Sequence, residues 1–156
     1  PDRLHGFENR FVDPAKLGFA PGEGVEMALA DGQLYASWKD TQADALCLTA
    51  ERAVEAQGRE LCVSVYAGGK QNAWADRRWG YQAWLELALC RDGREVTTLR
   101  AELPLESDKE RARACAVRAA AQDGFDTCKM RVWITPLDGT IAGGELTLSN
   151  WEVDVR

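Results

Sequence analysis

Hydrophobic and polar residues alternate with a period of two in several short segments of the chain. The clearest is YQAWLELALC (81–90), in which every second residue from Ala83 to Leu89 is apolar. Side chains alternate between the two faces of a strand, so this pattern predicts a β-strand with one face in the core. The same alternation recurs in 25–30, 32–38, 45–50, 60–67, 95–103, 129–137 and 144–156.

Short Gly-containing turn signals separate these segments, among them ADG (30–32), RDG (91–93) and LDG (137–139). The segments 25–30 and 32–38 flank such a turn and are predicted to form a hairpin. Many short strands at this spacing are typical of two packed antiparallel sheets. We therefore predict an all-β, two-sheet antiparallel jelly-roll β-sandwich that forms a single domain over residues 1–156.

One segment, 107–124, conflicts with this pattern. Ser107 and Glu110 stand at capping-box spacing, the segment is rich in Ala and Arg, and Gly124 would end a helix. Alternatively, Cys115 and Val117 share one face of a strand. Tertiary context often overrides local propensity. We predict a strand at 111–119, with one short helix near 108–122 as the alternative.

Charge argues against a nucleic-acid partner, and hydropathy argues against a transmembrane segment. The net charge is −6 and the basic residues are dispersed, whereas nucleic-acid binding needs a concentrated cationic surface. No apolar run approaches the roughly 20 residues of a transmembrane helix. We expect no nucleic-acid partner and no transmembrane segment.

Five cysteines occur without a CxxC or a short Cys/His grouping, which argues against zinc. Either Cys47 and Cys62 or Cys115 and Cys128 could be bridged, and a disulfide would favour a periplasmic or extracellular location. The alternative is a set of unpaired thiols packed as small hydrophobic side chains.

Three stretches resemble the jelly-roll carbohydrate-binding modules of the galactose-binding-like class. They are GFENRF (6–11), ALCLTAERAVEAQGRELCVSVYAGG (45–69) and KMRVWITPLDGTIAGGELTLSNWEVDV (129–155). The resemblance implies a jelly roll whose last strand is carried by a hairpin. It also implies a structural Ca²⁺ site at Glu8 and Asn150, although Asn150 stands where the modules have an acidic residue and is a weaker ligand.

Strand parity also predicts a binding surface. Trp84, Trp133 and Tyr66 each lie opposite a core-facing set, and indole or phenol faces can hold the C–H surface of a sugar ring. The predicted polar contacts are Gln82, Glu86 and Arg131, and Trp74 and Trp79 would wall one end. If the ligand is a uronate, Arg77, Arg78 and Arg131 would bind its carboxylate.

A structural role for these rings is the alternative, because half-buried Trp and Tyr side chains often bond to backbone. Trp38 and Trp151 are assigned to packing. Catalysis has little support: the single histidine, His5, has no evident Ser or Cys partner, and no pair of acids stands out.

We predict a non-catalytic carbohydrate-binding module of an exported bacterial-type protein, with an oligo- or polysaccharide as ligand. A neighbouring catalytic domain is a possible partner, and no cofactor is expected beyond a structural calcium. The alternative is a protein-interaction or structural domain of an envelope or secretion assembly, because Trp, Tyr and Arg also dominate protein interfaces.

Overall fold

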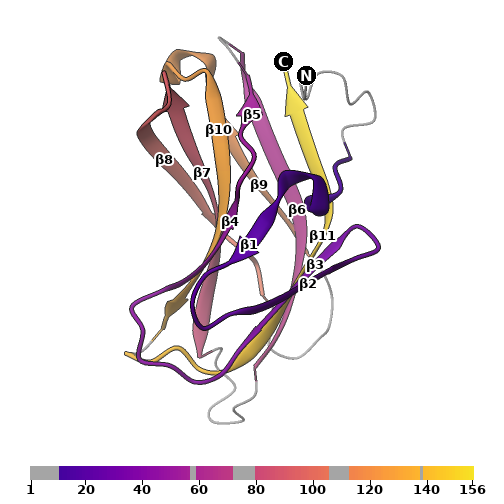
Figure 1. The fold of residues 1–156 in the computed structure, drawn as a ribbon, viewed down its shortest axis with the longest axis vertical. Coiled ribbons are helices and arrows are strands. Elements are labelled where there is room, and N and C mark those ends of the chain that lie inside the picture. Colours follow the sequence, from indigo (N-terminus) through magenta and orange to yellow (C-terminus); the bar gives the residue numbers. More distant parts are fainter. Residues whose placement is uncertain (1–10, 57–58, 72–79, 106–112, 138) are drawn as a thin grey trace.

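The computed structural model describes residues 11–56, 59–71, 80–105, 113–137 and 139–156. These residues form two antiparallel sheets packed face to face (Figure 1). The first sheet has the order β1 (Phe19–Pro21), β4 (Leu46–Ala50), β10 (Thr127–Pro136), β7 (Tyr81–Arg91) and β8 (Arg94–Glu102), and β5 (Val54–Glu55) also pairs with β10. The second has the order β2 (Glu26–Ala30), β3 (Gln33–Trp38), β11 (Gly144–Val155), β6 (Leu61–Gln71) and β9 (Arg113–Ala119).

The helical segments within the described ranges are two short 3₁₀ turns, Pro14–Leu17 and Ala121–Asp123. The predicted all-β antiparallel sandwich is therefore confirmed. Within those ranges, no helix combines the length and apolar character that a bilayer crossing requires.

Two hairpins form where Asp-Gly dipeptides allow left-handed backbone. Asp31 and Gly32 have φ angles of 52° and 74°, and Asp92 and Gly93 have 52° and 78°. Two successive positive φ angles define the type I′ turn that suits the twist of paired strands. The predicted hairpin of β2 and β3 is confirmed, and β7 and β8 form the second.

The hairpin expected at 129–155 is wrong, because β10 belongs to the first sheet and β11 to the second. The connection between them pairs with a different segment. Ile141 and Thr41 exchange two backbone hydrogen bonds of 2.9 Å, and the Asp40 carboxylate accepts from the Gly143 N–H at 2.5 Å. These contacts direct the chain across the sandwich instead of back along the same sheet.

The strand predicted at 111–119 is confirmed over Arg113–Ala119, where β9 pairs with β6. A helix is therefore excluded over these residues, and 106–112 lie outside the described residues. Cys115, Val117 and Ala119 are all buried, at 7%, 5% and 0% exposure. Burial of this alternating set outweighs the local helix propensity of the Ala-rich sequence.

The predicted core faces are confirmed on the three strands that define them. The inward side chains are Val63, Val65, Ala83, Leu85, Leu87, Leu89, Met130, Val132 and Ile134, each at most 1% exposed. Trp38 and Trp151 are buried, as their packing role requires. The Trp38 indole N–H donates to the Ala142 carbonyl at 2.7 Å, and the Trp151 ring lies 5.1 Å from that of Phe19.

The expected disulfides are wrong, because all five cysteines are unpaired. Cys47 lies on the outward face of the first sheet and Cys62 on that of the second, so the whole sandwich separates them. Cys115 and Cys128 are buried on strands of opposite sheets. Packed sheets lie about 10 Å apart, whereas a disulfide needs Cα atoms within about 7 Å.

Candidate functional site

The outward side chains of β4, β10, β7 and β8 form one continuous surface, which we call the tryptophan face. Trp133 on β10 lies directly opposite Trp84 on β7, and their outer neighbours are Cys47 on β4 and Glu102 on β8. The adjacent row contains Thr49, Arg131, Glu86 and Arg100. Cross-strand pairs stand about 5 Å apart, so two indoles and four charged groups share a small area.

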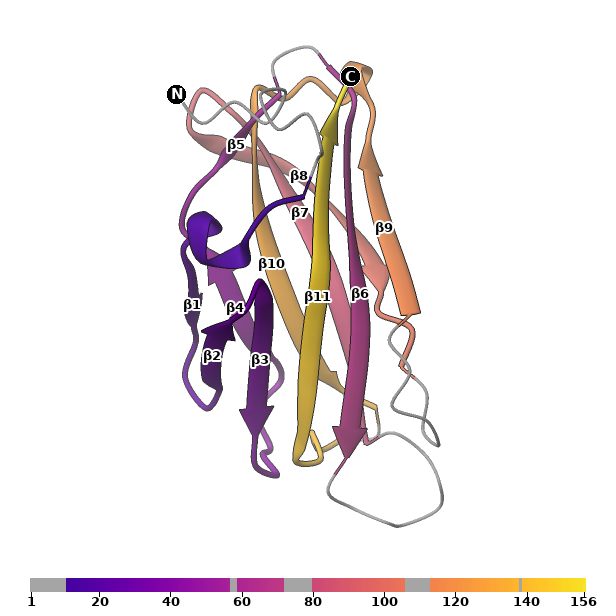
Figure 2. The ribbon, with the colours of Figure 1, turned by 90° about the vertical axis from the view of Figure 1, so that its right-hand side faces the viewer.

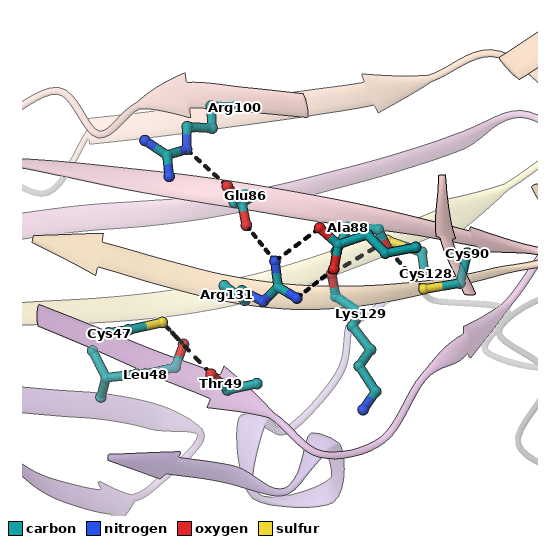
Figure 3. Close-up of polar contacts among 11 residues, drawn as sticks. Cys47, Leu48, Thr49, Glu86, Ala88, Cys90, Arg100, Cys128, Lys129 and Arg131 are labelled. Carbon is teal, nitrogen blue, oxygen red and sulfur yellow. Dashed lines mark hydrogen bonds and ion pairs between the residues drawn. The ribbon is translucent and has the colours of Figure 1, made fainter. Parts of the chain in front are cut away.

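Glu86 is the centre of a charge network on this face (Figure 3). Its carboxylate accepts from Arg100 Nε at 2.8 Å and from Arg131 Nη1 at 2.9 Å. Arg131 also donates to Glu95 at 2.6 Å through Nη2. Although Glu86 points outward, it is only 3% exposed, because the two guanidinium groups cover it.

The network keeps Glu86 ionised. Burial alone raises the pKa of this carboxyl, but hydrogen bonds from Arg100 and Arg131 and the nearby Trp133 indole together lower it below its ordinary value. The Trp133 Nε1 does not reach hydrogen-bond geometry with any residue in the described ranges. The indole N–H therefore lowers the pKa of Glu86 by its proximity alone. Hydrogen bonds to Glu95 and Glu86 raise the pKa of Arg131, which stays charged.

Arg100 is the site residue that the sequence analysis missed. Its guanidinium carbon lies 5.2 Å from the centre of the Trp133 ring, in cation–π geometry. Its Nε is bonded to Glu86, while its two terminal nitrogens bond to none of the described residues. Part of the signal was present in β8: Leu99 and Ala101 face the core side, so Arg100 between them must face outward.

Two further side-chain hydrogen bonds lie on this face. The Trp84 indole N–H donates to the Thr135 hydroxyl at 2.8 Å, which fixes the ring beside β10. The Gln82 side chain donates to the Glu102 carboxylate at 2.8 Å. This arrangement offers flat apolar rings next to planar amide, carboxylate and guanidinium groups.

The structure brings five of the predicted site residues together on the tryptophan face: Trp84, Trp133, Gln82, Glu86 and Arg131. Tyr66 is not among them, because β6 belongs to the second sheet and Tyr66 points outward from the opposite side of the sandwich. Parity identified its outward face correctly but carried no information about which sheet the strand would join. The predicted residues Trp74, Trp79, Arg77 and Arg78 lie outside the described residues.

The candidate calcium ligands are not tested as a pair. Glu8 lies outside the described residues, and Asn150 is an exposed bulge residue with a φ of 51°. Among the residues that the structure describes, no group of three or more His, Cys, Asp or Glu side chains is placed to hold a metal.

No protein-family model matches the sequence, and no curated protein matches it. Solved structures with similar folds do exist. One is the enzymatically active domain of bacteriophage CBA120 tailspike protein 4, at 11% identity and a TM-score of 0.59, with 89% of this chain and 19% of that chain covered. Another is the arabinose-bound α-L-arabinofuranosidase MgGH51, at 12% identity and a TM-score of 0.55, with 93% and 24% covered.

A third similar structure is TmCBM61 in complex with β-1,4-galactotriose, at 12% identity and a TM-score of 0.52. Here the match covers 96% of this chain and 97% of that chain, whereas this chain spans only a small part of the tailspike and the arabinofuranosidase. At these identities the similarity concerns the fold alone. The fold-level resemblance to jelly-roll carbohydrate-binding modules is confirmed.

Proposed function

We propose that this chain is a non-catalytic carbohydrate-binding module whose ligand lies across the tryptophan face. The observation that carries the proposal is the pairing of Trp84 and Trp133 on neighbouring strands beside Gln82 and Arg100. An indole offers a flat apolar surface to sugar C–H groups, and amide and guanidinium groups bond to hydroxyls or carboxylates. The fold shared with a module bound to β-1,4-galactotriose supports the same proposal.

The two indoles have different roles in this proposal. Arg100 already lies on the Trp133 ring, so Trp84 is the ring that receives a neutral sugar unit. Arg100 presents its two terminal nitrogens beside that unit, and they bond a uronate carboxylate where the ligand has one. Arg131 is occupied by Glu86 and Glu95, so it orients Glu86 and Arg100 and does not itself bind the carboxylate.

We further propose that the chain serves an exported polysaccharide-processing protein, next to a catalytic domain. With the cysteines unpaired, the disulfide argument for export no longer applies. The support that remains is the similarity of fold to parts of a tailspike and of an arabinofuranosidase. Glu86 is buried and bonded to two arginines, which does not suit a catalytic acid or base. We therefore assign catalysis to the neighbouring domain.

Tryptophan fluorescence tests the site directly. We expect titration with neutral β-1,4-linked or uronate-containing oligosaccharides to shift the emission, and Trp84→Ala to weaken binding about tenfold. Trp84→Phe is the matched control, because it keeps a ring and should retain part of the affinity. Circular dichroism must show both variants folded. Unchanged binding in folded Trp84→Ala, or no binding to any glycan, would exclude the tryptophan face as a sugar site.

A further inference from the structure

A second group of exposed rings lies on the outward face of the other sheet, the sheet nearer the viewer in Figure 2. Tyr35 on β3 is 39% exposed and Tyr66 on β6 is 41% exposed. Both point away from the core, because the residues before and after each tyrosine along its strand are buried. The sandwich therefore carries aromatic rings on both of its outer faces.

The strand register sets the spacing of these two rings. Tyr35 lies opposite Thr147 on β11, and Thr147 lies opposite Gly68 on β6, two residues beyond Tyr66. With standard strand spacing and rise, the two tyrosine Cα atoms are about 12 Å apart. The residues between or beside the rings are small, namely Thr147, Gly68 and Ser149. No bulky side chain among these three separates one ring from the other.

An open hollow of about 310 Å³ lies beside Tyr35, lined by Glu26, Ser37, Glu145 and Thr147. A larger one of about 600 Å³ continues from it toward Trp38 and shares Glu26, Ser37 and Glu145. Together they form a depression along β2, β3 and β11. We call this depression, with Tyr35 and Tyr66, the tyrosine face.

The charges of the tyrosine face limit its ligands. Glu26 and Glu145 each line both hollows, and an ionised carboxylate only accepts hydrogen bonds. Among the described side chains that line the hollows, Lys39 is the single cation. A ligand that suits this surface has many hydroxyl donors, flat apolar patches and no negative charge.

We propose that the tyrosine face is a second carbohydrate site, selective for neutral oligosaccharides. The ligand class rests on the proposed function, but the site uses different strands and side chains. Because the two faces lie on opposite sides of the sandwich, one molecule links two glycan chains. Binding of two chains at once raises avidity without any new contact.

Calorimetry with the whole chain tests the number and place of the sites, using β-1,4-galactotriose and xylo- and gluco-oligosaccharides of equal length. We expect two sites for at least one neutral sugar. Tyr35→Ala/Tyr66→Ala should weaken one site about tenfold, and Trp84→Ala should leave that site intact. Wild type should cross-link a soluble neutral polysaccharide and raise its turbidity, and either variant should lose this ability.

Phe11→Ala is the matched control. Phe11 is 54% exposed on the same side, opposite Glu152 on β11, and lies outside the hollows. A sugar site should tolerate its loss. If Phe11→Ala weakens binding as much as the tyrosine variant, the face is a broad apolar patch suited to a protein partner, and the proposal is overturned.

The remaining outcomes separate the two sites. A single site removed by Trp84→Ala alone overturns the tyrosine face and leaves the proposed function in place. A single site removed only by the tyrosine variant supports this inference and excludes the tryptophan face. Absence of binding to every neutral sugar overturns the second site, whatever acidic oligosaccharides do.

Discussion

At the scale of single residues, the defining feature is a carboxylate on the outer surface that solvent scarcely reaches. Glu86 is covered by Arg100 and Arg131, which are themselves partly exposed, with side-chain exposures of 41% and 24%. Each arginine side chain loses conformational freedom when it reaches from its strand to the Glu86 carboxylate. Because Arg100 and Arg131 share this carboxylate, both guanidinium groups are held in fixed positions. The network therefore positions Arg100 over Trp133 in the unbound protein, so the binding proposed above requires less ordering of this side chain.

Removal of the Glu86 charge tests this role. Glu86→Gln keeps the shape of the side chain but weakens two charge-assisted hydrogen bonds, so we expect the free energy of unfolding to fall by about 1–3 kcal/mol. Urea denaturation measures the change. Glu102→Gln is the matched control, because among the described residues that exposed carboxylate bonds to Gln82 alone, and it should shift stability by less than about 0.5 kcal/mol. Equal effects of the two substitutions would show that Glu86 has no special role.

The same carboxyl gives a prediction for pH. Its native pKa is lowered, so its contribution to stability is complete above the unfolded-state value of about 4.3 and disappears as the pH falls through the native pKa. We expect the difference in urea midpoint between wild type and Glu86→Gln to shrink between pH 7 and pH 3. Denaturation at several pH values measures it. A difference that stays constant down to pH 3 would contradict this coupling.

Arg100 should determine the preference for acidic ligands. Arg100→Lys keeps a positive charge but loses the planar fork, so we expect binding of a uronate-containing oligosaccharide to weaken about tenfold, with a smaller change for a neutral one. Isothermal calorimetry on both sugars gives the comparison. Arg118→Lys, on the opposite sheet, should change neither. Equal losses for the neutral and the acidic sugar would mean that Arg100 does not recognise the carboxylate.

At the scale of elements, the last strand depends on one irregular residue. Asn150 has a φ of 51°, and the pairing of β11 with β6 shifts there. The extra residue changes the parity of the strand: Thr147 and Ser149 face outward before the bulge, and Glu152 faces outward after it. Trp151 can therefore point into the core beside Phe19. Asn tolerates left-handed backbone better than most residues, which explains an Asn at this position.

The bulge predicts opposite outcomes for two substitutions at one position. Asn150→Gly should change stability little, whereas Asn150→Val should cost about 1–2 kcal/mol, because a β-branched side chain is strained at positive φ. Ser149→Val, one residue earlier in ordinary strand geometry, is the control and should be tolerated. Urea midpoints measure all three. If Asn150→Val is as stable as Asn150→Gly, the backbone does not adopt this bulge.

Local patterns explain why most elements, but not their partners, were predictable. Alternation identified the core faces of β6, β7 and β10, and Asp-Gly dipeptides identified both type I′ turns. Sheet membership is a long-range property that no local pattern encodes. That is why Tyr66 was grouped with Trp84 and why β10 and β11 were expected to pair. The three-residue strand β1 and the two-residue strand β5 escaped notice because such segments are too short for alternation to show.

The same limit applies to the candidate site. Parity placed Trp84, Glu86 and Trp133 on one face, because each stands between two buried apolar neighbours. The pairing of Arg100 with Glu86 depends on the register of β8 against β7, and a bulge between Leu89 and Cys90 sets that register. No sequence pattern predicted the bulge, so the pairing of Arg100 with Glu86 was found only in the fold.

At the scale of the whole molecule, the sandwich presents two chemically different outer faces separated by one core. The tryptophan face combines indoles with arginines, and the tyrosine face combines phenols with exposed carboxylates. A core without cross-links must hold the two faces in a fixed relation. Its stability comes from the continuous set of buried side chains shared by the two sheets.

The absence of cross-links in the core can be measured on the five cysteines. A disulfide contributes about 2–4 kcal/mol, so without one the urea midpoint should not change when dithiothreitol is added, and all five thiols should react with Ellman's reagent in urea.

In the native state Cys115 and Cys128 should be protected: burial raises both pKa values, that of Cys128 to about 12 with Cys90 nearby. Cys47 and Cys62 are partly exposed and should react first, although burial raises their pKa values too. Fewer than five thiols in urea without reductant would mean that a bridge joins residues that this fold keeps apart.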